Sequence, residues 1–274
     1  MENKVLVRND LLKVDAYRFE GLVRSFPTHF HEYYTIGYMN GGNRRLICGG
    51  REYELKKGDM VLFNPRDSHA CIHSGGDMFF SGINIPKRVM AELAEGITGT
   101  SLAPRFRENV FGNIEYAVCF GELHENIMSG KEKSKAEEKL TLLVSKLIEE
   151  YAVRTEAAEC EDDMNRVCEY IKNNYMNRIT LDRLCKFAGV SKSTLLRYFT
   201  KQMGITPYGY LESIRICEAK KLLEKRMPPA QAALATGFYD QSHFTTYFTR
   251  FMGLTPNEFR SELTNDSGRS NNEK

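Results

Sequence analysis

The sequence predicts an α+β protein with two domains, an N-terminal antiparallel β-barrel with additional helices and an all-α C-terminal domain. The chain has 274 residues, and one domain contains about 100–200 residues. Short strand-like segments separated by turn residues fill the first 85 residues, whereas the chain from residue 164 has helical patterns and an internal repeat. A run of strands followed by a run of helices indicates separate domains.

The composition is that of a globular protein with reduced thiols. Hydrophobic residues make up 42% of the chain and charged residues 27%, and no apolar run approaches the roughly 18 residues of a membrane span. The N-terminus, MENKVLVRND, lacks the apolar stretch of a signal peptide. Seven cysteines without a Cys-x-x-Cys pair argue against a zinc finger and a disulfide framework. We therefore expect a cytoplasmic protein with no membrane partner.

The charge is unevenly distributed along the chain. Residues 164–263 contain 15 Lys and Arg against 8 Asp and Glu, whereas residues 1–163 contain 21 against 26. Such asymmetry indicates a polyanionic partner for the basic part. Because many basic domains bind nothing, the charge is only supporting evidence.

Seven segments in the first 85 residues have the apolar or alternating pattern of short β-strands. They are Tyr17–Gly21, Tyr33–Met39, Arg45–Cys48, Arg51–Leu55, Met60–Phe63, His69–Ile72 and Met78–Ile85. Gly49-Gly50 lies between two alternating runs, which is typical of a two-residue hairpin because glycine tolerates positive φ. Short, evenly spaced strands favour a small antiparallel barrel or sandwich.

Three helices are expected after these strands. The first, Lys87–Glu95, is followed by Gly96, a favourable residue just beyond a helix end. The second is Ile114–Met128. The third, Glu132–Tyr151, has a leucine-rich stripe at helical spacing. Two interpretations of this stripe remain open: the helix packs on its own barrel, or it forms a dimer contact.

The boundaries between domains follow from composition. Residues 1–153 form the barrel and its helices, and the acidic residues 154–163 have almost nothing to bury and predict a linker. Residues 164–263 form the helical domain, and the polar tail 264–274 is expected to be disordered. We expect few contacts to cross the linker.

The helical domain contains an internal repeat. Tyr198-Phe199-Thr200, Met203-Gly204 and Thr206-Pro207 recur 49 residues later as Tyr247-Phe248-Thr249, Met252-Gly253 and Thr255-Pro256. Two copies are too few for a solenoid. The repeat therefore indicates one helical module that is used twice.

The first copy, at about residues 181–203, has the arrangement of a helix-turn-helix motif. Thr180 can cap a first helix, Gly189 allows a sharp turn, and Ser191 can cap a second helix. The inward face of the second helix carries Leu195, Phe199 and Met203. Polar and basic residues on the opposite face are typical of a helix that lies in the major groove of DNA.

The second copy, at about residues 229–252, repeats this arrangement with Phe244, Phe248 and Met252 facing inward. Two ordinary helical hairpins with solvated faces are the alternative. Duplication favours DNA binding, because the intervening helix of about 18 residues spans about 27 Å. Successive major grooves on one face of DNA lie about 34 Å apart.

Specific residues in this domain also match a known family. They are Ala188-Gly189-Val190-Ser191, Leu195-x-Arg197-x-Phe199, Gly204-Ile205-Thr206-Pro207, Arg215-x-x-x-Ala219-x-x-Leu222-Leu223, Gly237-Phe238-x-Asp240-Gln241-Ser242-His243-Phe244 and Phe248-x-x-x-Met252-Gly253-x-Thr255-Pro256-x-x-Phe259-Arg260. On these residues, which extend over about 100 positions, the sequence resembles the AraC/XylS family of transcriptional regulators. The resemblance implies a DNA-binding domain with two helix-turn-helix motifs.

In that family the second helix of each motif enters the major groove. The residues carried over by position are Ser193, Leu196 and Arg197 in the first motif and Gln241, Ser242, Thr245 and Thr246 in the second. Lys192, Lys201, His243 and Arg250 on the same two helices complete the DNA-binding candidates. The second motif departs from the family pattern at Pro228-Pro229, where isoleucine is usual, and at Thr246, where arginine is frequent. Proline is tolerated in a first helical turn, but Thr246 puts a second guanine-reading contact in doubt.

The N-terminal part resembles the cupin-type sensory domain that often precedes this module. The residues that carry the resemblance are Pro27-Thr28-His29-Phe30-His31, Gly58-Asp59 and Asn64-Pro65-Arg66-Asp67-Ser68-His69. His29, His31 and Tyr33 alternate along an expected strand and would share one face. With His69 on a neighbouring strand, they are the candidate effector-binding residues.

The same histidines admit a rival function. His29, His31 and His69 could form a facial metal site, and the alternative to a regulator is a metal-dependent cupin enzyme fused to a DNA-binding module. The glutamate usual in cupin enzymes is missing, because Tyr34, Thr35 and Ile36 occupy its stretch. Hydrogen-bonding pocket residues are therefore the favoured interpretation. We expect no catalytic residues and no cofactor.

Together these features predict a sequence-specific, DNA-binding transcriptional regulator that is not an enzyme. A small-molecule effector of unknown identity in the barrel would shift an equilibrium between arrangements of different operator affinity. The expected partners are double-stranded DNA, the effector, a second copy in a homodimer, and RNA polymerase. Activation and repression are equally compatible with the sequence.

Overall fold

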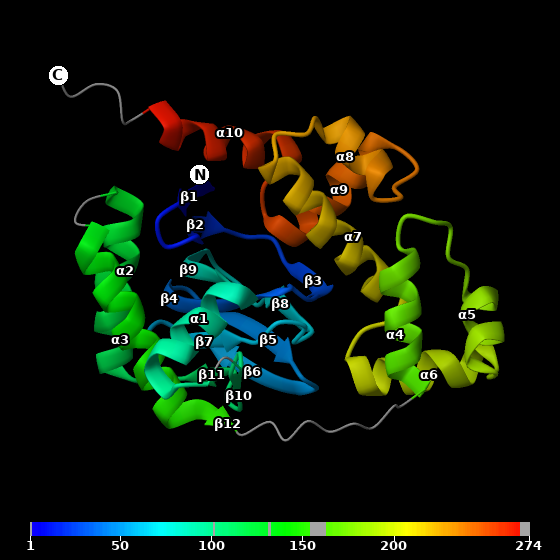
Figure 1. The fold of residues 1–274 in the computed structure, drawn as a ribbon, viewed down its shortest axis with the longest axis horizontal. Helices are drawn as coiled ribbons and strands as arrows, with labels where there is room; N and C mark the ends of the chain where they lie inside the picture. The colour runs from blue at the N-terminus through cyan, green and yellow to red at the C-terminus, as the bar shows by residue number, and fades with distance from the viewer. Residues whose placement is uncertain (1, 101, 131–132, 154–162, 269–274) are drawn as a thin grey trace.

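The computed structural model describes residues 2–100, 102–130, 133–153 and 163–268. A β-domain occupies one side of the molecule, and a helical domain wraps around its opposite side (Figure 1). None of the helices in these ranges is both long and apolar enough to cross a membrane.

Two antiparallel sheets form the centre of the β-domain. Their strands are β1 (Asn3–Asn9), β2 (Val14–Leu22), β3 (Phe26–His29), β4 (Tyr33–Gly41), β5 (Arg44–Cys48), β6 (Arg51–Leu55), β7 (Met60–Phe63), β8 (His69–His73), β9 (Met78–Pro86) and β11 (Val110–Phe111). The strand order is β1-β2-β9-β4-β7-β11 in the larger sheet and β3-β8-β5-β6 in the smaller one. Apolar side chains from both sheets meet in one core. The predicted antiparallel β-domain is confirmed.

All seven predicted strands are present, with ends that differ by three residues or fewer. Of the strands in the two sheets, β1, β3 and β11 were not predicted. Strand β1 lies at the sheet edge and carries Lys4 and Arg8, and charged edges weaken the apolar signal of a strand. Strand β3 contains Pro27, which argues against a strand when only the sequence is considered.

Three helices follow the strands, with two short strands between and after them. They are α1 (Lys87–Thr98), α2 (Ile114–Ser129) and α3 (Lys133–Tyr151), and β10 (Arg105–Phe106) pairs with β12 (Ala152–Val153). The expected end of α1 at Gly96 is wrong, because the helix continues to Thr98 and Gly99 caps it. Gly99 adopts a φ of +74° and its N–H donates to Glu95 O, the hydrogen bond that closes a left-handed helix end.

The leucine stripe of α3 belongs to the core of its own domain. Leu140, Leu143, Val144 and Leu147 are at most 2% exposed and pack in one cluster with α2 and the larger sheet. Figure 1 shows α2 and α3 side by side on the outer side of the barrel. Packing of the stripe on the barrel is confirmed, and a dimer contact through this helix stays a prediction.

The C-terminal domain is entirely helical within the described residues. Its helices are α4 (Asp163–Asn174), α5 (Leu181–Ala188), α6 (Lys192–Met203), α7 (Pro207–Glu224), α8 (Pro229–Ala235), α9 (Gln241–Met252) and α10 (Pro256–Gly268). Both helix-turn-helix motifs, α5–α6 and α8–α9, lie where the repeat predicts them. Helix α10 extends into the tail that was expected to be disordered from Thr264, so that expectation is wrong up to Gly268. Residues 154–162 of the predicted linker and 269–274 of the tail lie outside the described residues.

Local capping explains why the motifs form. The Thr180 side chain accepts a hydrogen bond from Arg183 N at 3.2 Å, and the Ser191 side chain accepts one from Thr194 N at 3.3 Å. Gly189 adopts a φ of +66° between the two helices, a conformation that favours glycine. These three residues have the roles that the sequence predicts.

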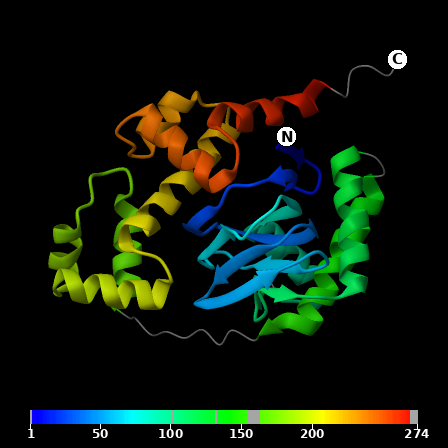
Figure 2. The ribbon, with the colours of Figure 1, turned by 180° about the vertical axis from the view of Figure 1, so that it is seen from behind.

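The two domains share an extensive interface, contrary to the expectation of few contacts. Helices α7 and α9 pack on β3, and α10 packs on β1; Figure 2 shows this face from behind. Leu6 lies in the apolar core of the second motif, and Phe30 lies in that of the first. Across the interface, Lys220 Nζ donates to Asp15 Oδ2 at 2.8 Å, with both side chains at most 10% exposed. Linker composition cannot reveal such contacts, because the residues are far apart in the chain.

Candidate functional site

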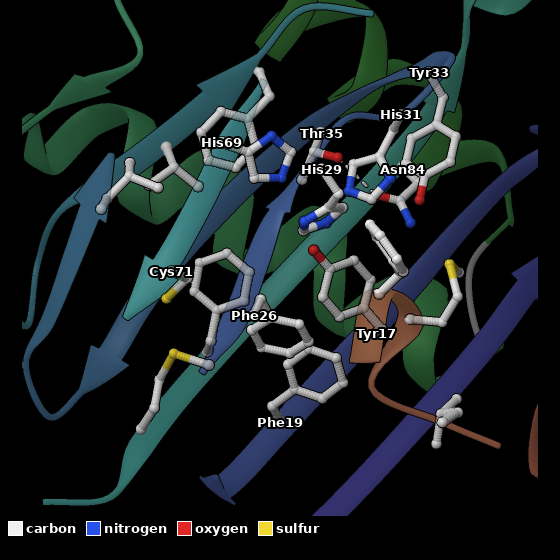
Figure 3. A pocket seen from close by; sticks show the side chains of 18 of the residues that line it. Tyr17, Phe19, Phe26, His29, His31, Tyr33, Thr35, His69, Cys71 and Asn84 are labelled. Carbon is white, nitrogen blue, oxygen red and sulfur yellow. Dashed lines mark hydrogen bonds between the residues drawn. The ribbon is translucent and has the colours of Figure 1, made fainter. Parts of the chain in front are cut away.

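A cavity of about 110 Å³ lies between the two sheets and the second helix-turn-helix motif. Apolar side chains, together with Tyr17 and Cys71, form most of its wall: Leu6, Phe19, Phe26, Met39, Leu46, Leu55, Val61, Phe63, Met78, Phe80, Phe251, Met252, Leu254 and Phe259. Polar groups gather at one end, where Figure 3 shows His29, His31, Tyr33, Thr35, His69 and Asn84. One water needs about 10–15 Å³ of such space, so the cavity has room for a small organic molecule.

All four predicted effector-binding residues line this cavity. The ring centroids of His29 and His69 are 4.5 Å apart, those of His29 and His31 are 4.7 Å apart, and those of His31 and His69 are 5.0 Å apart. Tyr33 stacks on His31 with a centroid distance of 4.6 Å and an angle of 11°. The structure therefore brings the predicted residues together at one end of the cavity.

His29 and His31 do not share a strand. His29 and His31 were expected on one strand, but β3 ends at His29. His31 lies in the following loop, where its carbonyl accepts a hydrogen bond from Arg66 N at 2.7 Å. His29 pairs with His69 across β3 and β8. Strand pairing and this loop contact, rather than period-two alternation, position the three rings.

Backbone carbonyls fix the tautomers of two histidines. His29 Nδ1 lies 2.6 Å from Pro27 O, and His69 Nδ1 lies 2.9 Å from Asp67 O. A carbonyl oxygen can only accept, so Nδ1 carries the proton in both rings. Burial, together with the neighbouring His69, lowers the pKa of His29 to about 3, and burial lowers the pKa of His69 to about 4. Both rings are neutral at pH 7, with unprotonated Nε2 atoms.

His31 is neutral for the same reasons. Burial lowers its pKa well below the usual value, and the adjacent His29 and His69 lower it further. One ring nitrogen of each of the three histidines lies within 4.8 Å of the others. The geometry can therefore present three neutral nitrogen donors to one ligand or ion.

Three other polar residues at this end were not predicted from the sequence. Thr35 Oγ1 donates to Asn84 Oδ1 at 2.9 Å, and both residues are buried. Lys220 Nζ lies 4.6 Å from the centroid of the Tyr33 ring, on the side of the interface. Burial lowers the pKa of Lys220, but the carboxylates of Asp15 and Glu224 outweigh this effect and raise it. No local motif marks these residues, because long-range packing brings them here.

The second motif closes the cavity. The ring of Phe251, near the end of α9, meets the edge of His29 at a centroid distance of 5.1 Å. Gly253 follows α9 directly, and its carbonyl accepts a hydrogen bond from Arg24 of the β-domain. Helix α9 thus lines the cavity with its C-terminal end, while Gln241 and Ser242 in its N-terminal part are exposed.

The first recognition helix, α6, has the predicted faces. Leu195 and Phe199 are fully buried, whereas Lys192, Ser193, Leu196, Arg197 and Lys201 are exposed. Arg197 lies over the ring of Tyr198 at 5.0 Å, and Lys192 pairs with Asp182 at 2.7 Å. Exposure is what DNA contact requires, while the contacts themselves stay a prediction.

The second recognition helix, α9, offers a smaller polar face. Gln241, Ser242, Thr246 and Arg250 are exposed, whereas His243 and Thr245 are half-buried. The ring of His243 packs against Tyr247 at 4.6 Å and Phe238 at 5.6 Å. His243 is thus partly committed to packing within the motif, and the four exposed residues form the more accessible surface.

Comparison with known families divides the chain in the same way. Residues 12–148 match the model of the AraC-like ligand binding domain, and residues 184–262 match that of a helix-turn-helix domain. An uncharacterized HTH-type transcriptional regulator of Bacillus subtilis, YbfI, is 41% identical over 88% of this chain and 90% of its own length. The HTH-type transcriptional activator RhaR of Escherichia coli is 24% identical over 86% of this chain and 87% of its own.

Solved structures share the two-domain fold. The apo form of a ToxT variant from Vibrio cholerae aligns with a TM-score of 0.55 at 16% identity, covering 96% of this chain and 97% of ToxT. Wild-type ToxT with a bound unsaturated fatty acid has the same TM-score and identity, covering 97% of this chain and 96% of ToxT. At this level of identity the likeness concerns the fold alone.

Proposed function

The chain belongs to the AraC family of helix-turn-helix transcriptional regulators with an N-terminal ligand-binding domain, and we propose that its cavity binds the effector. A small molecule in the cavity would set the orientation of α9 and so control the affinity for DNA. The observation that carries this proposal is that Phe251 and Met252, at the end of a recognition helix, line the same cavity as the barrel histidines. A ligand that contacts both can favour one arrangement over another.

The wall of the cavity supports an amphipathic molecule as the effector. Its body is apolar and its polar groups lie at one end, so it fits an amphipathic molecule with a polar or anionic head. Convergent polar groups in an apolar pocket orient a ligand. ToxT, which shares the fold, binds an unsaturated fatty acid, and this supports the same class here. His29, His31, Tyr33 and His69 would hold the head group.

Double-stranded DNA is the proposed macromolecular partner. Arg197 and Lys201 are exposed on α6, and Arg can read guanine while Lys contacts phosphate. Helix α7 has 18 residues and separates the motifs by about 27 Å, which supports contact with successive major grooves. A protein that regulates transcription from DNA would act in the cytoplasm of a bacterium.

A homodimer and a contact with RNA polymerase complete the proposal. The leucine stripe is buried, so a dimer would use the outer face of α2 and α3. Ile114, Val118 and Leu142 are 77%, 54% and 51% exposed there, which supports such a surface because large exposed apolar side chains cluster at interaction sites. RNA polymerase would lie within reach of a regulator bound beside a promoter.

The barrel is proposed to sense rather than to catalyse. The rival interpretation, a metal-dependent cupin enzyme, gains no support from the relatives, which are transcriptional regulators. The cavity wall carries no Asp or Glu among its residues in the described part of the chain. It thus lacks a carboxylate that could serve as a general acid or base.

Selection of bound DNA from a random pool with the full-length chain tests this function. Affinity for the selected sequence is then measured by fluorescence anisotropy with straight-chain carboxylates from butyrate to oleate. We expect one of them to change the affinity at least about 5-fold, a typical allosteric coupling. The double variant His31→Ala with His69→Ala should bind DNA but lose this response. His73→Ala, at the exposed end of β8, is the matched control.

Two results would contradict the proposal. Failure to enrich any sequence would exclude specific DNA binding. Binding of a carboxylate, detected by calorimetry, without any change in DNA affinity would exclude coupling between the cavity and α9.

A further inference from the structure

The three histidines of the cavity have the arrangement of a ligand set for a metal ion. One ring nitrogen of each lies within 4.8 Å of the others. Metal–nitrogen bonds of about 2.0–2.1 Å place the donors of one ion at most about 4.2 Å apart. Small ring rotations would therefore bring the three nitrogens to bonding distance.

The hydrogen bonds of two rings prepare them for coordination. His29 and His69 each donate Nδ1–H to a backbone carbonyl, Pro27 O and Asp67 O. Metal-bound histidines nearly always make such a second hydrogen bond, which fixes the ring and directs the other nitrogen to the ion. In the described part of the chain, no group donates a hydrogen bond to Nε2 of His29 or His69.

The surroundings select the kind of ion. Neutral imidazoles suit zinc, iron, copper and nickel, whereas calcium and magnesium require oxygen ligands. Cys71 also lines the cavity, but the possible ligand atoms that lie close together are those of His29, His31 and His69. The site offers three nitrogens and, among the residues described, no carboxylate in the cavity wall.

We propose that His29, His31 and His69 bind one divalent transition metal ion, with Zn²⁺ as the reference ion, at the polar end of the cavity. Three histidines leave at least one coordination position open, and here it would face the cavity. On the basis of the proposed function, we further infer that the anionic head of the effector occupies this position. Three neutral ligands leave the double charge of the ion uncompensated in an apolar cavity, and an anionic ligand would reduce it.

The metal site has a direct spectroscopic test. Full-length protein, freed of metal by a chelator, is titrated with Co²⁺, whose visible absorption reports nitrogen coordination, and Zn²⁺ is then added as a competitor. We expect one Co²⁺ per chain, displaced by one Zn²⁺. Azide should shift the visible bands if a position is open. Metal analysis of the protein purified without chelator gives an independent stoichiometry.

Matched variants connect the signal to the three rings. His31→Gln and His69→Gln should weaken Co²⁺ binding at least about 100-fold, because changes outside the coordination shell already cost about 10–100-fold. His73→Gln, on the same strand as His69 but exposed, should bind as the wild type does. Circular dichroism checks folding. If His69→Gln does not fold, His31→Gln carries the test, since the His31 side chain lies in a loop and is half-buried.

The outcomes separate this inference from the proposed function. Absence of stoichiometric Co²⁺ binding would overturn the metal site. A loss of Co²⁺ affinity in His73→Gln equal to that in His69→Gln would overturn it as well. A metal-free protein that still changes its DNA affinity with a carboxylate would leave the proposed function intact and overturn the role of the ion. Stoichiometric metal binding with no response to any carboxylate would support the site and contradict the effector class.

Discussion

Gly204 and Gly253 occupy equivalent positions, 49 residues apart, and each lies against the β-domain. Each ends a recognition helix with a positive φ, +66° in Gly204 and +75° in Gly253. A Cβ on Gly204 would overlap Ser68 Oγ, and one on Gly253 would lie 3.1 Å from Phe19 Cζ. The barrel therefore contacts both recognition helices at the same point of the repeated module.

This relationship connects the cavity to both motifs. Ser68 precedes His69, and Phe19 lines the apolar end of the cavity. A ligand that moves either segment acts on the end of a recognition helix. Because the module is repeated, the barrel makes the same type of contact with both helix-turn-helix motifs.

The first prediction concerns Gly253→Ala. An alanine at positive φ costs about 1–2 kcal/mol, and here its methyl group would also displace Phe19. We expect a loss of unfolding free energy larger than this backbone cost, together with a weaker effector response. Urea unfolding and fluorescence anisotropy measure the two effects.

Gly130→Ala is the control for the backbone cost alone. Gly130 ends α2 with a φ of +68°, and a Cβ there would meet nothing within 4 Å. This variant should lose only about 1–2 kcal/mol and keep its effector response. Equal losses of unfolding free energy in Gly253→Ala and Gly130→Ala would contradict the role of the Phe19 contact.

The second prediction concerns the ion pair across the interface. Lys220→Met removes the 2.8 Å partner of buried Asp15 and leaves Arg8, at 3.4 Å, as its one ion-pair partner among the described residues. Breaking a buried pair costs about 3–5 kcal/mol; with Arg8 in place we expect about 2–3 kcal/mol. Asp15→Asn in the same chain should recover part of this loss, because it removes the unpaired charge. Urea unfolding is measured for Lys220→Met, for Asp15→Asn and for the double variant. If the two single losses of unfolding free energy add up to that of the double variant, the pair does not couple the domains.

The third prediction concerns acid stability of the chelator-treated protein. His29 and His69 have pKa values of about 3 and about 4 in the native state, lowered by burial from 6.5. Below pH 6.5 the unfolded chain takes up protons that the native state does not, so stability falls as the pH decreases from 6.5 toward 4. Each histidine contributes a slope approaching about 1.4 kcal/mol per pH unit.

The variant His69→Gln isolates this contribution from that of the carboxylates. Its unfolding free energy should depend less steeply on pH between 6.5 and the native pKa of about 4. Urea unfolding at a series of pH values measures both slopes. A variant slope equal to that of the wild type would show that His69 is not kept neutral by burial.

Local signals explain what the sequence could predict. The hairpin at Gly49-Gly50 and the caps Thr180 and Ser191 depend on residues close together in the chain, and the structure contains all three. The histidine cluster was predicted as well, through an alternation that ends at His29. Its true basis is pairing with His69 and the loop contact of His31.

The interface between the domains could not be predicted in this way. Asp15 and Lys220 are 205 residues apart in the chain, and neither belongs to a recognisable motif. Phe251 has the pattern of a core residue in its own motif, and nothing in its neighbourhood indicates that it also borders a cavity in the barrel. Long-range packing decides which residues complete the site, and one sequence does not encode it as a local pattern.

The last prediction concerns base reading by α6. The exposed guanidinium of Arg197 can donate two hydrogen bonds to guanine O6 and N7, a contact that discriminates by about 1–3 kcal/mol. Arg197→Ala should relax the preference at one or two base pairs of the selected DNA. Lys201→Ala should instead weaken binding to all sequences evenly and lower the slope of log affinity against log salt by about 1. Anisotropy titrations on selected and random DNA at several salt concentrations separate these effects. Equal losses on both DNAs for Arg197→Ala would assign Arg197 to the phosphate backbone.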